Sequence, residues 1–326
     1  MFSDEKFTAL KKRFAEVKKH YLSMIDEKRN VAAKTVISKG CMYNVLPFEN
    51  EQHGYKVNGK IIPAPIMRDD CYIYRLDENG RVILMENMSE FLKIPTYFSL
   101  YTYFEDYIEH IYGDNSAPYR AEWAYRESGT VKKILCCAAK SCSVNLLEYE
   151  DSVLMGIRFF TDSGQPFNLQ FLYDANGALQ AIFRIWPKGQ KATIYSTAKI
   201  NYKALGLRLF AETEQAVSAF LKEHDGEHFT RFALDCYTGH GYVSLCFDTD
   251  LSEQYKDSPA DWAHCDFASL PLVEFPLDDE QIAKVKKTAI KVAGDLLKSE
   301  AFRTLAQDGA FRILVFDHNE LLCEKP

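Results

Sequence analysis

Residues 73–84 read Ile-Tyr-Arg-Leu-Asp-Glu-Asn-Gly-Arg-Val-Ile-Leu, and this stretch decides how the chain folds. Its Asn79-Gly80 pair lies between two apolar runs. A two-residue hairpin loop of type I′ needs φ > 0 at both central residues, which Asn and Gly adopt at the least steric cost. Asn58-Gly59 and Asn176-Gly177 lie in similar settings. The three pairs therefore predict that the first two-thirds of the chain is mainly an antiparallel β-meander.

An amphipathic helix is predicted before the meander, over residues 4–29. Its apolar residues recur every three or four positions, as one face of a helix requires. They are Phe7, Leu10, Phe14, Val17, Tyr21 and Met24. We expect this helix to pack on the sheet. Within the meander, Tyr103, Tyr107, Ile108 and Ile111 also share a helical spacing, so a short helix is predicted near residues 103–112.

The pattern changes near residue 200. Helical spacing over 212–223 and 278–298 alternates with strand-like runs at 229–237, 242–247 and 310–316. A loop is expected between the second of these strands and the second helix. The predicted fold class is α+β: an amphipathic helix (residues 1–30), an antiparallel β-meander module (31–200) and a smaller α+β domain (203–326).

Charge and composition restrict the possible partners. The net charge is −7, whereas residues 1–30 carry +3, so the rest of the chain is strongly acidic. Nucleic-acid binding needs clustered Lys and Arg, so nucleic acid is not expected as a partner. A basic protein suits this charge better. No apolar run approaches the ~18 residues of a membrane span, and the start of the chain lacks an apolar signal segment, so we expect a cytoplasmic protein without membrane contact.

Chemical motifs are scarce. The nine Cys are expected to be reduced, and Cys136 and Cys137 are adjacent, so they should point to opposite faces of a strand rather than share an ion. His240 lies between two glycines and is interpreted as a turn residue. His264 and Cys265 are adjacent in the chain, and adjacent side chains rarely point toward each other, so we do not interpret them as a catalytic dyad. Dinucleotide, Walker, nucleophile-elbow and zinc-protease motifs are absent from the sequence. We therefore predict no catalytic residue, no cofactor and no metal.

Three segments of the C-terminal part carry a family resemblance. They are Phe232-Ala233-Leu234-Asp235-Cys236-Tyr237, Asp257-Ser258-Pro259-Ala260-Asp261-Trp262-Ala263, and Asp308-Gly309-Ala310-Phe311 followed by the run from Ile313 to Asp317. In this order they resemble the bacterial domain of unknown function family 4303, except that Lys256 or Asp257 replaces a first aromatic residue. The resemblance implies an immunity-like protein that binds and blocks a toxin domain in the bacterial cytoplasm. It implies no catalytic residues.

Four residues are candidates for binding the partner. Asp248, Asp250 and Glu253 form an acidic cluster after a strand, and Trp262 belongs to a type enriched at interface hot spots. Each has a plainer interpretation. The carboxylates could belong to a solvated turn or bind Mg²⁺, and Trp262 could hold its loop against the core.

The leading hypothesis is a non-enzymatic protein-binding module, an immunity-like inhibitor that occludes a toxin domain, which is expected to be basic. Two alternatives stay open. One is an unrecognised hydrolase or nucleotide-processing enzyme with a cleft between the two modules, which buried carboxylates or histidines without structural partners would favour. The other is a structural subunit of a larger assembly, which a long exposed edge strand or apolar patch would favour.

Overall fold

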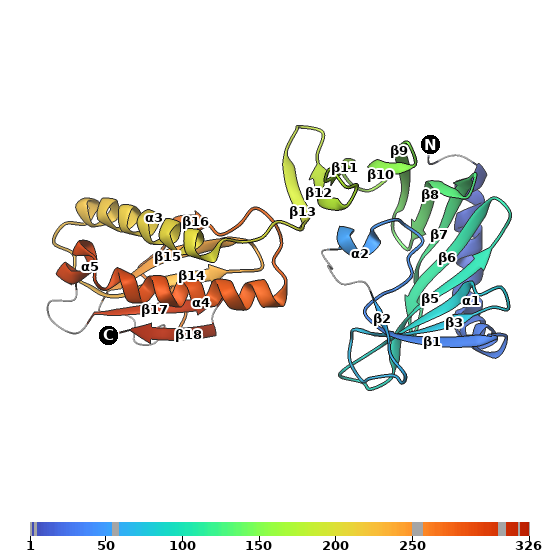
Figure 1. Ribbon diagram of the computed structural model, residues 1–326, viewed down its shortest axis with the longest axis horizontal. Coiled ribbons are helices and arrows are strands. Elements are labelled where there is room, and N and C mark those ends of the chain that lie inside the picture. The colour runs from blue at the N-terminus through green and yellow to red at the C-terminus, as the bar shows by residue number, and fades with distance from the viewer. Residues whose placement is uncertain are drawn as a thin grey trace. The chain divides into compact units, whose positions relative to one another are not determined.

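The chain divides into two compact units, residues 1–195 and residues 196–326. The computed structural model, drawn in Figure 1, describes residue 2 and residues 5–53, 59–249, 257–305, 311–318 and 320–325. Among these residues, none of the helices is both long enough and apolar enough to cross a membrane. Each unit has its own sheet and its own buried core.

Unit 1 combines two helices with one 13-stranded sheet in the order β13-β12-β11-β10-β9-β8-β7-β6-β5-β4-β3-β1-β2. The helices are α1 (Glu5–Asn30) and α2 (Glu49–Gln52). The strands are β1 (Lys34–Lys39), β2 (Lys60–Ile61), β3 (Cys71–Leu76), β4 (Val82–Met88), β5 (Pro95–Tyr103), β6 (Tyr107–Asp114), β7 (Pro118–Glu127), β8 (Thr130–Ala138), β9 (Cys142–Glu150), β10 (Val153–Thr161), β11 (Phe167–Tyr173), β12 (Leu179–Ile185) and β13 (Lys191–Ser196). From β3 to β13 each strand neighbours the next one along the chain. The predicted helix and antiparallel meander are therefore confirmed.

Two of the three Asn-Gly pairs do form hairpin turns, but not of the predicted type. Gly80 and Gly177 adopt φ of 75° and 78°, whereas Asn79 and Asn176 are not among the described residues with positive φ. In the first turn, Gly80 N–H donates to the Asp77 carbonyl, and Asp77 Oδ1 accepts from the N–H groups of Asn79 and Arg81. This is a type I turn followed by a left-handed glycine, and the Asp carboxylate stabilises it by binding backbone donors.

The third Asn-Gly pair lies at the edge of the described chain. Asn58 is outside the described residues, so the predicted turn at Asn58-Gly59 is not placed. The strand that follows, β2, pairs with β1, with Ile61 opposite Ser38. Its partner is therefore a strand about twenty residues earlier in the chain.

The predicted helix near residues 103–112 is wrong, because this segment is the turn between β5 and β6 followed by β6 itself. Ile108 and Ile111 are both buried although they point to opposite faces of the strand. Both faces of β6 are covered, so its apolar residues do not alternate. Their spacing then resembles that of a helix.

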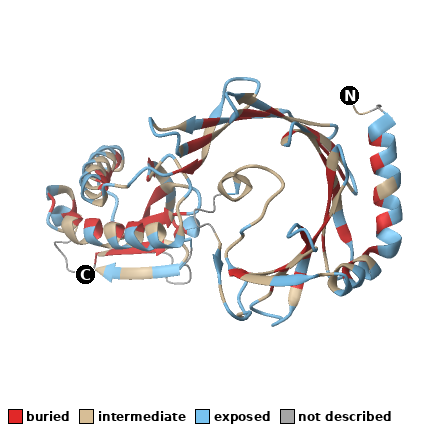
Figure 2. Cartoon of the chain, turned by 45° about the vertical axis from the view of Figure 1, so that its right-hand side comes forward, coloured by how far each residue is buried: buried red, intermediate tan, exposed pale blue. Residues whose placement is uncertain are grey.

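The helix α1 covers one face of the sheet and the segment 41–53 covers the other. The buried residues of α1 pack against β4 to β9 through side chains such as Leu100, Ile111 and Leu135. On the opposite face, Tyr43, Val45, Leu46 and Phe48 pack against a second core cluster. Figure 2 shows the sheet curving, with α1 along its outer side and α2 inside the curve.

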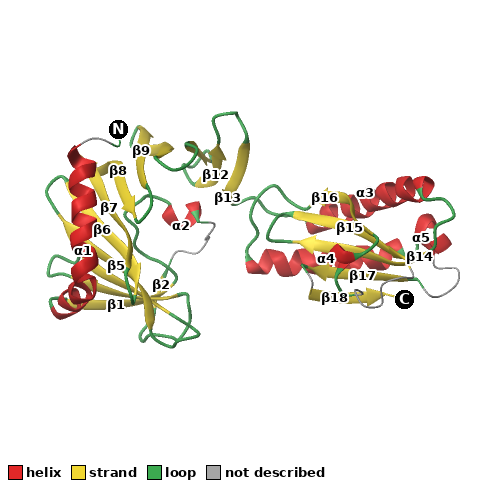
Figure 3. Cartoon of the chain, turned by 180° about the vertical axis from the view of Figure 1, so that it is seen from behind, coloured by secondary structure: helices red, strands yellow, loops and turns green. Residues whose placement is uncertain are grey.

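Unit 2 is a five-stranded sheet with helices. Its helices are α3 (Tyr202–Glu223), α4 (Asp279–Leu296) and α5 (Glu300–Leu305), with a 3₁₀ turn η2 (Pro259–Asp261). Its strands are β14 (Phe229–Tyr237), β15 (Tyr242–Thr249), β16 (His264–Pro271), β17 (Arg312–Asp317) and β18 (Glu320–Lys325), in the order β16-β15-β14-β17-β18. Among the described strands of unit 2, β14 and β17 pair in parallel and the other neighbouring strands pair antiparallel. Figure 3 shows these elements by type. The α+β fold predicted for this part is confirmed, but the strands β16 and β18 were not predicted.

Capping residues determine where the two long helices of unit 2 begin. Asn201 accepts a hydrogen bond from the backbone N–H of Ala204 at the start of α3. Asp278 and Gln281 form a capping box at the start of α4. The first helix therefore begins ten residues before the predicted Glu212.

The two faces of the second sheet have different coverings. One face holds Phe232, Leu245 and Val315 and packs against α3 and α4. The other face holds Ala233, Cys246, Leu314 and Phe316, which form a separate cluster with Trp262. Because side chains alternate along each strand, neighbouring residues such as Phe232 and Ala233 belong to different clusters.

Candidate functional site

The structure places Asp248 in the interior, which corrects its prediction as a partner-binding residue. Its side chain is 1% exposed, on β15 directly opposite Arg231 of β14. Arg231 Nη1 lies 3.3 Å from Asp248 Oδ2. A buried carboxylate paired in this way serves the sheet rather than a surface. Asp250 and Glu253, the other members of the predicted acidic cluster, lie outside the described residues.

Trp262 is also buried, at 3% exposed, and does not form a contact surface. It follows the 3₁₀ turn η2 and packs edge-on against Phe316 of β17, with ring centroids 6.3 Å apart. Its neighbours are the apolar side chains of the second face of the sheet. Trp262 therefore holds its loop against the core, which is the plainer of the two interpretations.

The adjacent cysteines of β8, Cys136 and Cys137, point to opposite faces of the sheet, as predicted. Cys137 and Cys142 are opposite each other across the two strands, both buried, with sulfur atoms 2.7 Å apart. They belong to the core beneath α1, whereas Cys136 pairs with Ser143 on the other face of the sheet. Burial raises the pKa of the Cys137 thiol to about 12. At neutral pH this thiol is therefore protonated and a weak nucleophile.

An apolar surface lies where the β4–β5 connection meets the starts of β5 and β7. Phe91 is 90% exposed, and the other members are between two-fifths and half exposed. We define the hairpin-tip patch as Phe91, Leu92, Ile94, Tyr97 and Tyr119. The two tyrosines are linked through Tyr112 of β6, which stacks on the Tyr97 ring and meets the Tyr119 ring edge-on.

Backbone hydrogen bonds hold the loop that carries Phe91. The N–H of Lys93 donates to the carbonyl of Ser89, and the N–H of Leu92 donates to the Ser89 hydroxyl. Lys93 adopts the left-handed conformation, with φ 59°, that this tight loop requires. Outside the loop, Asp69 Oδ1 accepts from the N–H of Glu90 at 2.7 Å. The apolar side chains are therefore presented by an ordered turn.

Carboxylates surround the patch. Asp69 and Glu90 flank the loop, and Asp114 lies beside Tyr119 and accepts a hydrogen bond from its hydroxyl group. Burial works against ionisation of Asp114, but hydrogen bonds from Ser116 and Tyr119 outweigh it and lower its pKa well below the ordinary value. Asp114 is therefore negatively charged at physiological pH, and this end of the sheet combines apolar side chains with negative charge.

A buried polar row crosses the inner face of the same sheet. His110 is 5% exposed, stacks on Tyr101 and lies with Nδ1 2.8 Å from Glu122 Oε2. Arg120 pairs with Glu122 and, at 3.9 Å, with Glu49 of α2. Burial alone would raise the pKa of Glu122, but Arg120 and His110 outweigh it and hold that pKa at about 2. The row thus connects α2 to the sheet by charge.

Two buried nitrogens of this row, Arg120 Nε and His110 Nε2, make no hydrogen bond within the described part of the chain, although Arg120 Nε lies 3.1 Å from Glu122 Oε1. The other ring nitrogen of His110 is paired with Glu122 and its ring stacks on Tyr101, so His110 is not the partnerless histidine that the enzyme alternative predicts. The sequence analysis did not select it, because a histidine within an apolar strand gives no local sign of burial among charged groups.

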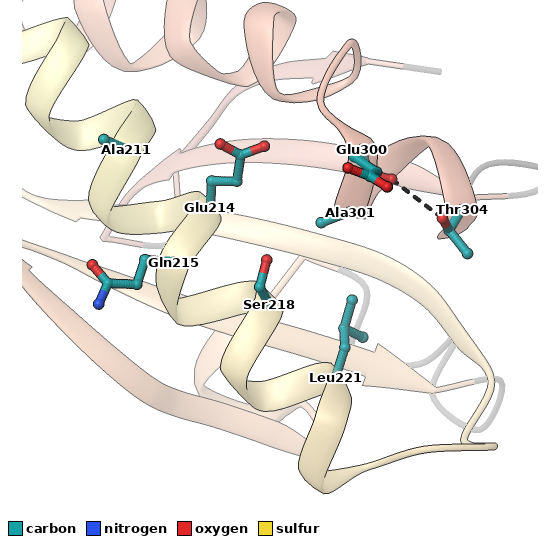
Figure 4. A pocket seen from close by; sticks show the side chains of 8 residues that line it. All are labelled: Ala211, Glu214, Gln215, Ser218, Leu221, Glu300, Ala301 and Thr304. Atoms are coloured by element: carbon teal, nitrogen blue, oxygen red, sulfur yellow. Dashed lines mark hydrogen bonds between the residues drawn. The ribbon is translucent and has the colours of Figure 1, made fainter.

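An open depression in unit 2, of about 630 Å³, lies between α3 and α5. Figure 4 shows Glu214 and Ser218 from α3 on one side and Glu300 and Thr304 from α5 on the other. Small-molecule sites are usually enclosed and mainly apolar, with a few converging polar groups. This depression is open and lined largely by carboxylate, amide and hydroxyl groups, so it does not fit that description.

Comparison with known proteins provides no further assignment. No protein-family model matches the chain, and no curated protein matches it. The resemblance of residues 203–326 to the domain of unknown function family therefore stays a prediction. The chemistry of the molecule has to be argued from its own residues.

Proposed function

We propose that this protein works by binding another protein through the hairpin-tip patch, without catalysing a reaction. The observation that carries the proposal is the exposure of Phe91, at 90%, beside the exposed Leu92 and Ile94 on a loop held by hydrogen bonds, at the end of the sheet where Tyr97 of β5 and Tyr119 of β7 are also exposed. Contiguous exposed apolar surface marks an interaction site more often than scattered single residues do. Aromatic residues are also enriched at the centres of protein interfaces.

The energetics of the patch suit a stable complex. Complete burial of one large apolar side chain contributes roughly 1.5–3 kcal/mol. Phe91 and Leu92 adjoin in the loop, and both would lose most of their exposed surface under a partner. The loop is already held by Ser89 and Asp69, so little conformational entropy is lost on binding.

The charge of the surroundings favours a basic partner. Asp69, Glu90 and Asp114 lie beside the patch, and the whole chain carries −7. Complementary charge accelerates association and disfavours wrong partners more than it adds affinity. We therefore infer a partner that offers an apolar groove with Lys or Arg at its rim.

The finer form of the proposal is an immunity-type inhibitor in the bacterial cytoplasm that covers the active site of a toxin domain. It rests on the resemblance of the C-terminal part and on the acidic character of the chain. Its mechanism would be occlusion, with Phe91 inserted into the partner's groove and the neighbouring carboxylates facing its basic rim.

Site-specific photo-crosslinking tests the proposal in the cells that produce the protein. A photoreactive phenylalanine analogue is placed at Phe91 and, as a matched control, at Leu172, which is exposed on β11 of the same unit. We expect one protein to be captured from position 91 and not from position 172. The double substitution Phe91→Ser with Leu92→Ser should abolish its co-purification, while Leu172→Ser should not.

Two results would contradict binding through the patch: no adduct at position 91, or undiminished co-purification of the partner with the double variant. Circular dichroism should show that the double variant is folded, because both residues are exposed. The finer proposal has its own readout. The parent protein, but not the double variant, should restore growth of cells that express the partner, and a harmless partner would refute the inhibitor role alone.

A further inference from the structure

Three side chains that can bind a metal meet at the edge of unit 2. His224 follows the last residue of α3, Glu227 lies in the turn before β14, and His264 begins β16. Glu227 Oε1 lies 2.7 Å from His264 Nε2, and Glu227 Oε2 lies 3.0 Å from His224 Nδ1. All three ligand atoms lie within 4.8 Å of one another.

The backbone brings these residues together from two distant segments. The N–H of His224 donates to the carbonyl of Phe220, and the N–H of Glu227 donates to the carbonyl of His224. Between them, Gly226 has φ 83°, so the chain turns back at once. His264 arrives from 37 residues later because β16 pairs with β15, with His264 opposite Phe247.

Aromatic rings hold both imidazoles in place. The Phe220 ring stacks on His224, with centroids 4.2 Å apart, and meets His264 edge-on at 5.1 Å. Phe229 contacts the other histidine ring, His264, at 5.7 Å. The rings form an apolar wall on one side, whereas both histidines are partly exposed on the other. The nitrogen atoms are therefore preorganised beside Glu227 and open to solvent.

We propose that His224, Glu227 and His264 bind one divalent cation of the zinc class. Two imidazole nitrogens and one carboxylate with a position left for water are a common zinc ligand set. Zinc bonds of about 2.0–2.2 Å place tetrahedral ligands about 3.4 Å apart, so the 2.7 Å contact of Glu227 Oε1 would open by about 0.7 Å and the 3.0 Å contact of Glu227 Oε2 by about 0.4 Å. Small rotations of the Glu227 side chain provide this movement.

The site is independent of the hairpin-tip patch, which belongs to the other unit. A bound ion would connect the end of α3 to β16, the edge strand of the sheet. Because it binds the folded state and not the unfolded one, it would stabilise unit 2 by mass action.

Calorimetric titration with zinc chloride tests the site in the full chain after removal of metals by a chelator. We expect one ion per chain and a rise in the thermal unfolding midpoint on loading. His264→Ala should weaken zinc binding by at least tenfold, consistent with the loss expected for a perturbed metal site. Glu227→Gln should also weaken it. His240→Ala, in the β14–β15 turn, is the matched control and should bind zinc like the parent.

Cobalt supplies a second readout, because its visible absorption reports the ligand set directly. The cobalt spectrum of the parent should be that of a nitrogen- and oxygen-ligated ion and should disappear in His264→Ala. Absence of stoichiometric zinc binding would overturn the proposal, leaving these residues as a surface ion-pair cluster. Zinc binding that survives in both His264→Ala and Glu227→Gln, or a cobalt spectrum with thiolate absorption, would overturn it equally, because the ion would then lie elsewhere.

Discussion

Removal of the Arg13 side chain should weaken the attachment of the centre of α1 to the sheet. Arg13 donates from Nε and Nη2 to the two carboxylate oxygens of Glu109 on β6, at 2.9 and 2.8 Å. Trp123 Nε1 donates to Oε1 of the same carboxylate at 3.2 Å. The Glu109 side chain is 1% exposed, so Arg13→Ala leaves a buried carboxylate with Trp123 as its remaining hydrogen-bond donor among these three residues.

The expected loss in the free energy of unfolding is large for a single residue that faces the surface. Breaking a buried ion pair by removing one partner costs roughly 3–5 kcal/mol. The Arg13 side chain is itself 35% exposed, so water can partly reach the vacated position, and we reduce the expected loss to about 2–3 kcal/mol. The pair of Arg158 with Glu148 is shorter, at 2.6 Å, but both side chains are about half exposed. Arg158→Ala should therefore cost less than about 1 kcal/mol.

Urea unfolding followed by pulsed hydrogen exchange and mass spectrometry measures the effect, because peptides of the two units report separately. Arg13→Ala should lower the free energy of unfolding of unit 1 and leave peptides of unit 2 unchanged. In a double-mutant cycle, Arg13→Met with Glu109→Gln should be less destabilising than the sum of the two single changes. Equal losses for Arg13→Ala and Arg158→Ala, or additive single changes, would refute the assignment of this energy to the buried pair.

Two further predictions concern other buried groups. Because the folded-state pKa of Glu122 is depressed to about 2, its contribution to stability is present above the unfolded pKa of about 4.3 and is lost as pH falls toward about 2. Urea unfolding at several acidic pH values should show a steeper loss for the parent than for Glu122→Gln, and equal slopes would contradict the pairing with Arg120. Trp262→Ala should destabilise unit 2 by about 3–5 kcal/mol, since it leaves a cavity beside Phe316. Calorimetry of the variant measures this loss of stability. If the variant were as stable as the parent but did not bind the partner, the core role of Trp262 would be wrong and a partner-contact role would be indicated.

Local patterns in the sequence were sufficient to predict a helix or strand where only one face of it is buried. The predicted α1 stripe is such a case: Phe7, Leu10, Phe14, Val17 and Tyr21 are buried as their spacing predicts, whereas Met24 is half-buried and its neighbour Ile25 is buried instead. The Asn-Gly pairs at 79–80 and 176–177 likewise located two hairpins. The predicted type I′ turn was wrong at both pairs, because Asp77 and Asp174 stabilise a different turn by accepting backbone N–H donors.

Patterns misled where both faces of a strand are covered. Tyr107 to Ile111 resembles a helix in spacing, but α1 lies on one side of β6 and the segment 41–53 packs on the other. Four consecutive residues of β6, from Ile108 to Ile111, are buried and include Glu109 and His110, so the alternation of apolar and polar residues by which a strand is recognised is lost. The strand β16 was missed for a related reason, since most of its residues are exposed or half-buried and its pairing with β15 provides the stabilisation.

The sequence by itself determined the α+β class, the leading helix and the long antiparallel meander, because these depend on periodicities of a few residues. Only the tertiary structure decided which polar residues are available for chemistry. It buried Asp248 and Trp262, exposed Phe91, and joined His224 and Glu227 to His264. Burial and long-range proximity depend on strand register and on what covers each face, and a one-residue change of register reverses every side chain of a strand. The spacing of residues in the sequence indicates neither the register of a strand nor what covers each of its faces.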